Sequence, residues 1–111
     1  MKDNFYTHAL WHVKEGKIAE FVEAWKRFGY VLSEIPGSPP AQGTLIQNLA
    51  DPLFFYSFGP WESLEDIGVM RKNENIKKAL LDIIELCQEA KPGNYKTVEK
   101  LSFPGKRKIN S

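Results

Sequence analysis

The sequence has little cysteine and no long apolar run, and both absences limit the class of protein. Cys87 is the only cysteine among 111 residues, which excludes an internal disulfide and a cysteine-based metal cluster. No segment approaches the roughly 20 apolar residues that cross a bilayer, and the amino-terminal segment MKDNFYTHAL lacks the apolar stretch of a signal peptide. We therefore predict a cytoplasmic protein with no membrane partner.

The sequence also lacks a large excess of either positive or negative charge. Lys and Arg number 15 against 14 Asp and Glu, and without Lys106, Arg107 and Lys108 twelve basic residues remain. A slightly acidic body argues against a nucleic-acid partner. The length is that of one domain. We predict a single domain over residues 1–103 and a basic tail over residues 104–111.

The spacing of apolar residues predicts an α+β fold. Apolar side chains recur every three or four positions in the helical segments and have no such spacing in the strands. The expected order is strand, helix, strand, strand, helix, helix, strand, over residues 5–13, 17–35, 44–49, 53–59, 63–72, 76–87 and 95–103. This order fits an antiparallel sheet with helices on one face, of the ferredoxin-like kind.

Local signals define the ends of these segments. Residues 36–40 contain three prolines and end the first helix, and Ser63 is expected to cap the next. Residues 91–93, Lys-Pro-Gly, are expected to close the last helix. Cys87 lies on the apolar stripe of that helix, which favours a small core residue over a nucleophile. Gly29 is expected to let another backbone approach the first helix.

Both histidines lie in the first predicted strand. Side chains four residues apart on one strand face are roughly 13 Å apart, so His8 and His12 cannot bind one zinc ion through bonds of about 2 Å. The more apolar odd-numbered positions should face the helices and leave the even-numbered ones on an uncovered face. We predict a homodimer across that face, with both histidines hydrogen-bonded in the interface rather than catalytic.

The sequence contains no glycine-rich phosphate loop, Ser-His-Asp order or acidic metal cluster, so it lacks the motifs of a hydrolase or a kinase. It does contain residues 53–63, LFFYSFGPWES, in which a strand passes through a Gly-Pro step and ends on Trp61. With the opening Lys14-Glu15-Gly16, the spacing of Phe21 and Trp25, and the turn Asp51-Pro52, this stretch resembles the antibiotic biosynthesis monooxygenase domain. That family comprises small dimeric α/β-barrel proteins, and the resemblance covers residues 6–101.

The resemblance implies a cavity between sheet and helices. Some family members oxidise aromatic polyketides with molecular oxygen and no cofactor, and others bind and degrade haem. Trp61 matches a tryptophan that lines the pocket of active members; the alternative is that it closes the end of the sheet as a core residue. The haem-degrading members carry a histidine downstream, where residues 69–72 have none, and an asparagine where this chain has Ala9. Haem ligation by that route is excluded, and we expect neither cofactor nor metal.

These considerations give a set of candidate site residues. The catalytic candidates are Trp61, Tyr56 and Arg71, where Arg71 would stabilise a phenolate unless it is an exposed residue at a helix end. The substrate-binding candidates are Asn48, Ser57, Phe21 and Trp25. The predicted function is a cofactor-independent, monooxygenase-like reaction on a small aromatic or quinol substrate. A non-catalytic dimer that binds a small molecule and an interaction module remain as alternatives.

Overall fold

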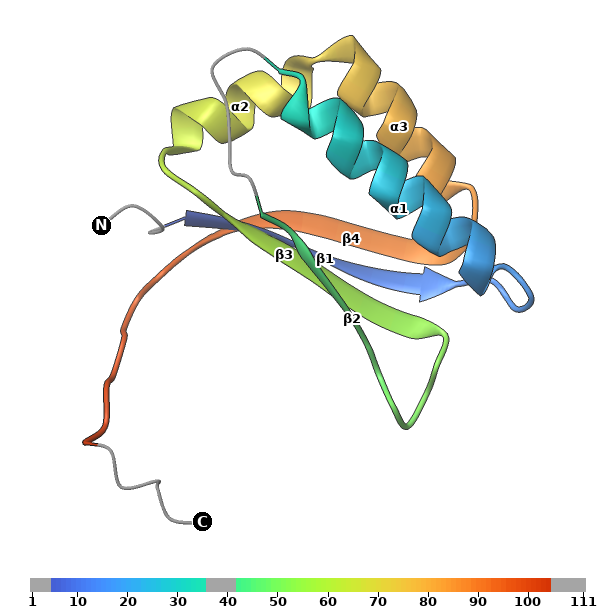
Figure 1. Cartoon of the computed structure of the whole chain (residues 1–111), viewed down its shortest axis with the longest axis horizontal. Coiled ribbons are helices and arrows are strands. Elements are labelled where there is room, and N and C mark those ends of the chain that lie inside the picture. The colour runs from blue at the N-terminus through green and yellow to red at the C-terminus, as the bar shows by residue number, and fades with distance from the viewer. Residues whose placement is uncertain (1–4, 36–41, 105–111) are drawn as a thin grey trace.

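The computed structural model describes residues 5–35 and 42–104, which form an antiparallel sheet with helices on one face (Figure 1). The expected helix end at residues 36–40 and most of the expected tail lie outside the described residues. The sheet order is β2-β3-β1-β4, so the expected ferredoxin-like α+β fold is confirmed. The elements are β1 (Phe5–Val13), α1 (Ile18–Ser33), β2 (Thr44–Gln47), β3 (Phe54–Trp61), α2 (Leu64–Lys72), α3 (Glu74–Ile84) and β4 (Cys87–Lys96).

The central strand β1 alternates as predicted. Ala9, Trp11 and Val13 are buried under the helices, whereas the even-numbered positions are only partly buried. β1 pairs with β3 on one side and β4 on the other, and Ala9 lies opposite Ser57 and Pro92. Because side chains alternate along a strand, this register also places the odd-numbered residues of β3 on the helix-covered face.

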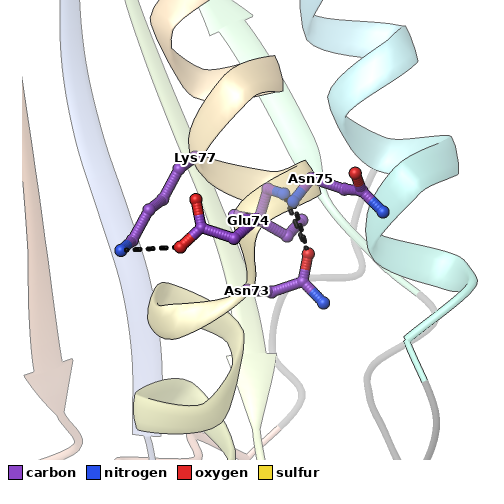
Figure 2. Close-up of polar contacts among 5 residues, drawn as sticks. Asn73, Glu74, Asn75 and Lys77 are labelled. Atoms are coloured by element: carbon purple, nitrogen blue, oxygen red, sulfur yellow. Dashed lines mark hydrogen bonds and ion pairs between the residues drawn. The ribbon is translucent and has the colours of Figure 1, made fainter.

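Helices α2 and α3 each begin at a side chain that accepts backbone N–H groups of the first turn. Ser63 caps α2 as predicted, accepting the backbone N–H of Asp66 at 3.1 Å. Asn73 separates α2 from α3, and its Oδ1 accepts the backbone N–H groups of Asn75 at 2.8 Å and Ile76 at 3.0 Å (Figure 2). Such caps satisfy backbone donors that have no partner within the first turn. The two helices can therefore follow each other without a longer loop.

The last strand differs from the prediction. β4 begins at Cys87 and ends at Lys96, so the expected strand at 95–103 is wrong, and residues 97–104 form neither helix nor strand. Pro92 does not close a helix; it lies within β4, which pairs only with β1. Proline is tolerated in an edge strand because one side of the strand needs no donor. Cys87 is a buried core residue as predicted, but in a strand.

Two clusters of buried side chains form the core between sheet and helices. One surrounds Phe21 and Trp11, and the other surrounds Trp61 and Ile67. Where the loop before β2 crosses β3, a Cβ on Gly59 would lie 2.7 Å from the backbone oxygen of Gln42, so only glycine allows this approach. No helix in the described part of the chain has the length and apolar character to span a membrane.

Candidate small-molecule site

A cavity of about 650 Å³ lies between the helices and the covered face of the sheet. We call this covered face the inner face; its central positions are Thr7, Ala9, Trp11, Ser57, Gly59 and Trp61. The cavity is lined by these residues, by His8 and Phe58 of the same two strands, and by residues of all three helices, β4 and the loop at Gln42. Its size falls in the range of about 300–1,000 Å³ that is typical of sites for small molecules.

Two buried tryptophans are fixed by hydroxyl groups on the neighbouring strand. Trp11 Nε1 donates to Ser57 Oγ at 2.9 Å, and Trp61 Nε1 donates to Thr7 Oγ1 at 3.1 Å. Both indoles are 3 % exposed. Each indole has a single donor, which these bonds use, so only the rings of the two lining tryptophans are left for other contacts. The hydroxyl hydrogens of Thr7 and Ser57 remain as donors. Trp61 is thus both a buried core residue and a residue that lines the cavity, so the two alternatives, a pocket residue and a core residue, do not exclude each other.

Arg71 brings a positive charge to the cavity from the last turn of α2. Its Nε and Nη2 donate to Asn94 Oδ1 at 3.2 and 2.8 Å. Asn94 lies on β4, opposite Thr7 of β1. Desolvation by burial lowers the pKa of Arg71, but an arginine remains charged at neutral pH. Arg71 therefore lines the cavity and is held by a neutral amide.

The cavity brings together four of the seven candidate residues: Trp25, Ser57, Trp61 and Arg71. The other three lie elsewhere. Phe21 is 0 % exposed in the core, with its ring 4.9 Å from that of Phe55. Asn48 is at the β2–β3 turn, where its Oδ1 accepts the backbone N–H of Ala50 at 2.7 Å. Tyr56 lies on the uncovered face, with its ring 5.7 Å from that of His8.

Among the residues that sequence reasoning missed are two that line the cavity, Thr7 and Gly29, and one that holds a lining side chain, Asn94. Thr7 could have been identified from the sequence, because it is an odd-numbered residue of the first strand and those positions were predicted to face the helices. Asn94 could not have been identified in this way, because residues 91–93 were assigned to a helix end. Gly29 was expected to admit a second backbone, and this is wrong: a Cβ there would meet no atom within 4 Å. Gly29 instead leaves space at the cavity wall.

The uncovered face of the sheet, called the outer face, holds Tyr6, His8, Leu10, His12, Ile46, Phe54, Tyr56 and Tyr95. His12 stacks on Phe54 with ring centroids 4.1 Å apart, and His8 contacts Tyr95 edge-on at 5.3 Å. Among the described residues, no three His, Cys, Asp or Glu side chains are grouped so that they could hold a metal ion.

Fold and cavity together define a ferredoxin-like protein with a cavity under its helices. No family model matches the sequence, and no curated protein matches it. Solved structures do. SnoaB, a cofactor-independent oxygenase from Streptomyces nogalater, is 15% identical with a TM-score of 0.76, over 89% of this chain and 97% of that one.

Two further structures show the same likeness. A protein from Bordetella bronchiseptica, provisionally named an antibiotic biosynthesis monooxygenase, has a TM-score of 0.73 and 15% identity over 87% of this chain and 99% of its own. A conserved protein from Methanosarcina mazei Go1 has a TM-score of 0.74 and 16% identity, over 87% and 95%. The resemblance to the antibiotic biosynthesis monooxygenases is confirmed as a likeness of fold, and a fold alone does not determine an activity.

Proposed function

We propose that this protein binds a small aromatic or quinol substrate in the inner cavity and oxidises it with molecular oxygen, without a bound cofactor. The observation that carries the proposal is a cavity of about 650 Å³ in which indole rings and one guanidinium line the same space. The rings suit a flat aromatic molecule, and the cation suits the anion that such a molecule must become before it can reduce oxygen. The fold shared with a cofactor-independent oxygenase agrees with this chemistry.

The reaction requires little covalent chemistry from the protein. A substrate methylene group or phenol loses a proton, and the resulting anion transfers an electron to O2. In the simplest balance, one methylene group and one O2 give a carbonyl group and one water. Among the described residues, no Asp or Glu lines the cavity to take the proton. The proposal is therefore a substrate that is acidic itself, with the protein contributing by stabilising its anion.

Three lining residues have proposed roles in this reaction. Arg71 stabilises the anion, the Ser57 hydroxyl donates a hydrogen bond, and the Trp61 ring packs against the substrate. Tyr56 and Asn48 take no part in this scheme because their side chains lie outside the lining. Trp25 completes the aromatic wall from α1.

Oxygen uptake with a panel of anthrones and hydroquinones tests the proposal. We expect uptake that is proportional to protein concentration and that falls about 100-fold in Arg71→Gln, the size of effect seen when one stabilising donor is removed from an anion. Lys78→Gln is the matched control, because Lys78 is exposed on α3 and does not line the cavity. Equal rates for the two variants would contradict the role of Arg71.

A non-catalytic binding protein is the second candidate. Ala9 contributes only a methyl group to the cavity, and the indole N–H groups of Trp11 and Trp61 are already engaged. These features leave few groups that could act on a substrate. Binding of aromatic ligands, measured by tryptophan fluorescence, together with no oxygen uptake across the panel would favour this candidate over the enzyme.

The proposed working form is a homodimer joined through the outer face. The helices cover only the inner face (Figure 1), and Tyr95 and Ile46 on the outer face are 55% and 48% exposed. Beyond β4, Val98, Leu101 and Phe103 are also exposed, at 85%, 70% and 79%. Large apolar side chains gathered on one face are typical of a surface that meets a partner.

Sedimentation equilibrium tests the dimer. Leu10→Lys places a charge at the centre of the outer face and should yield monomers. Leu81→Lys is the control, since Leu81 is 57% exposed on α3, away from the sheet. A wild-type protein that is monomeric at all concentrations would refute the dimer, as would a Leu10→Lys variant that associates as tightly as the control.

A further inference from the structure

The side chains that line the cavity carry charge of one sign. Three basic residues line it, namely Lys26, Arg71 and Lys77, and within the described ranges no acidic residue does. The whole chain is nearly neutral, with 15 basic and 14 acidic residues, so this imbalance belongs to the site and not to the composition. A concave site lined by one sign of charge concentrates ligands of the opposite sign.

The two lysines already have acidic partners. Lys26 pairs with Glu23 at 3.3 Å on α1, and Lys77 pairs with Glu74 at 3.4 Å on α3 (Figure 2). The side chains of both pairs are half exposed or more. Exposed pairs of this kind contribute little to stability, and neither lysine needs a ligand to balance its charge.

Arg71 is different because its partner is neutral. Two of its five N–H donors converge on one oxygen of Asn94, and no carboxylate among residues 5–35 and 42–104 pairs with it. A partly buried cation without a counter-ion is unfavourable, and a ligand carboxylate can remove that cost by accepting two parallel hydrogen bonds. Asn94 holds the guanidinium in place, and no carboxylate of the described ranges compensates its charge.

From these observations we infer that the cavity selects an aromatic molecule that carries a carboxylate, with Arg71 binding the carboxylate and the tryptophans contacting the rings. This inference deepens the proposed function and rests on it for the identity of the site. Gly29 leaves space for the rings, since even a Cβ at that position would meet no protein atom within 4 Å and Gly29 lines the cavity. The selected class is therefore a flat aromatic acid.

Calorimetric titration with 2-naphthoate and its neutral isostere 2-naphthamide tests the charge. We expect 2-naphthoate to bind at least tenfold more tightly, and we expect Arg71→Gln to remove this preference while leaving 2-naphthamide unchanged. Lys78→Gln is the matched control for loss of one positive charge, and Arg71→Lys should retain part of the preference. Equal affinities for the two probes in the wild-type protein, or an unchanged preference in Arg71→Gln, would overturn the inference.

Asn94→Asp provides an independent test that leaves Arg71 in place. The new carboxylate would pair with the guanidinium, so the preference for 2-naphthoate should fall as in Arg71→Gln, and a preference that survives would contradict the inference. Gly29→Leu should weaken the binding of both probes alike, because it removes space from the cavity and does not change its charge.

Binding and turnover are read separately. A preference for the acid without oxygen uptake by any acidic anthrone or hydroquinone would refute the oxygenase and retain the acid site. Oxygen uptake with neutral substrates and no preference for 2-naphthoate would refute the acid site alone.

Discussion

The two faces of the sheet both carry aromatic side chains but hold them by different means. On the inner face, each buried indole donates to a hydroxyl of the adjacent strand, as Trp11 does to Ser57. On the outer face, His12 is held by stacking on Phe54, and neither imidazole makes a hydrogen bond to another described residue. The inner face is therefore completed by its own chain, whereas the outer face has polar groups left to meet water or another surface.

The largest expected difference between the faces is in the cost of losing an aromatic ring. Phe55→Ala, on the inner face of β3, should reduce the free energy of unfolding by about 3–5 kcal/mol, because Phe55 is 4 % exposed and its removal leaves a cavity. Phe54→Ala, on the partly exposed outer face, is the comparison and should cost markedly less. Urea unfolding at low protein concentration measures both. Equal losses under those conditions would contradict the contrast between the faces.

A smaller effect is expected from one inner hydrogen bond. Ser57→Ala leaves the Trp11 N–H buried without its acceptor, which should cost about 1–3 kcal/mol. Ser102→Ala is the control, because Ser102 is exposed beyond the last strand. Thermal unfolding followed by circular dichroism compares them. If the two substitutions cost the same, the Trp11–Ser57 bond does not stabilise the inner face.

Local sequence signals were sufficient for the parts of the fold that depend on neighbouring residues. The alternation of Ala9, Trp11 and Val13 predicted which face of β1 is buried, and the position of Ser63 before an acidic turn predicted a helix cap. The same alternation, continued along β3, would have separated Tyr56 from Ser57. The sequence contained this information, although both residues were placed in one site.

Other features depend on contacts between distant segments and could not be predicted locally. Pro92 usually indicates the end of a helix, and only its place in an edge strand beside β1 makes it compatible with β4. Arg71 and Asn94 are 23 positions apart, and their hydrogen bond follows from that same strand. Because β4 was misplaced, Asn94, which holds the guanidinium of Arg71, was missed.

The smallest expected effect concerns the inner face at high pH. Burial raises the pKa of the Cys87 thiol from 9.0 to about 11, against the opposing charge of Lys14. The folded state thus favours the neutral thiol, and the unfolded chain releases the proton at lower pH. The stability that depends on the neutral thiol is fully present below pH 9 and is lost as the pH rises toward 11.

Cys87→Ala isolates this contribution from the lysines and tyrosines that titrate over the same range. The difference in unfolding free energy between wild type and Cys87→Ala should shrink by about 1 kcal/mol between pH 8 and pH 10.5. A thiol that is fully shielded from water would give a larger change. Urea unfolding at both pH values measures it. A constant difference would mean that water reaches the thiol. Water would then reach the inner face at the end where β4 begins. The contrast between a shielded inner face and an exposed outer face would hold only around the cavity.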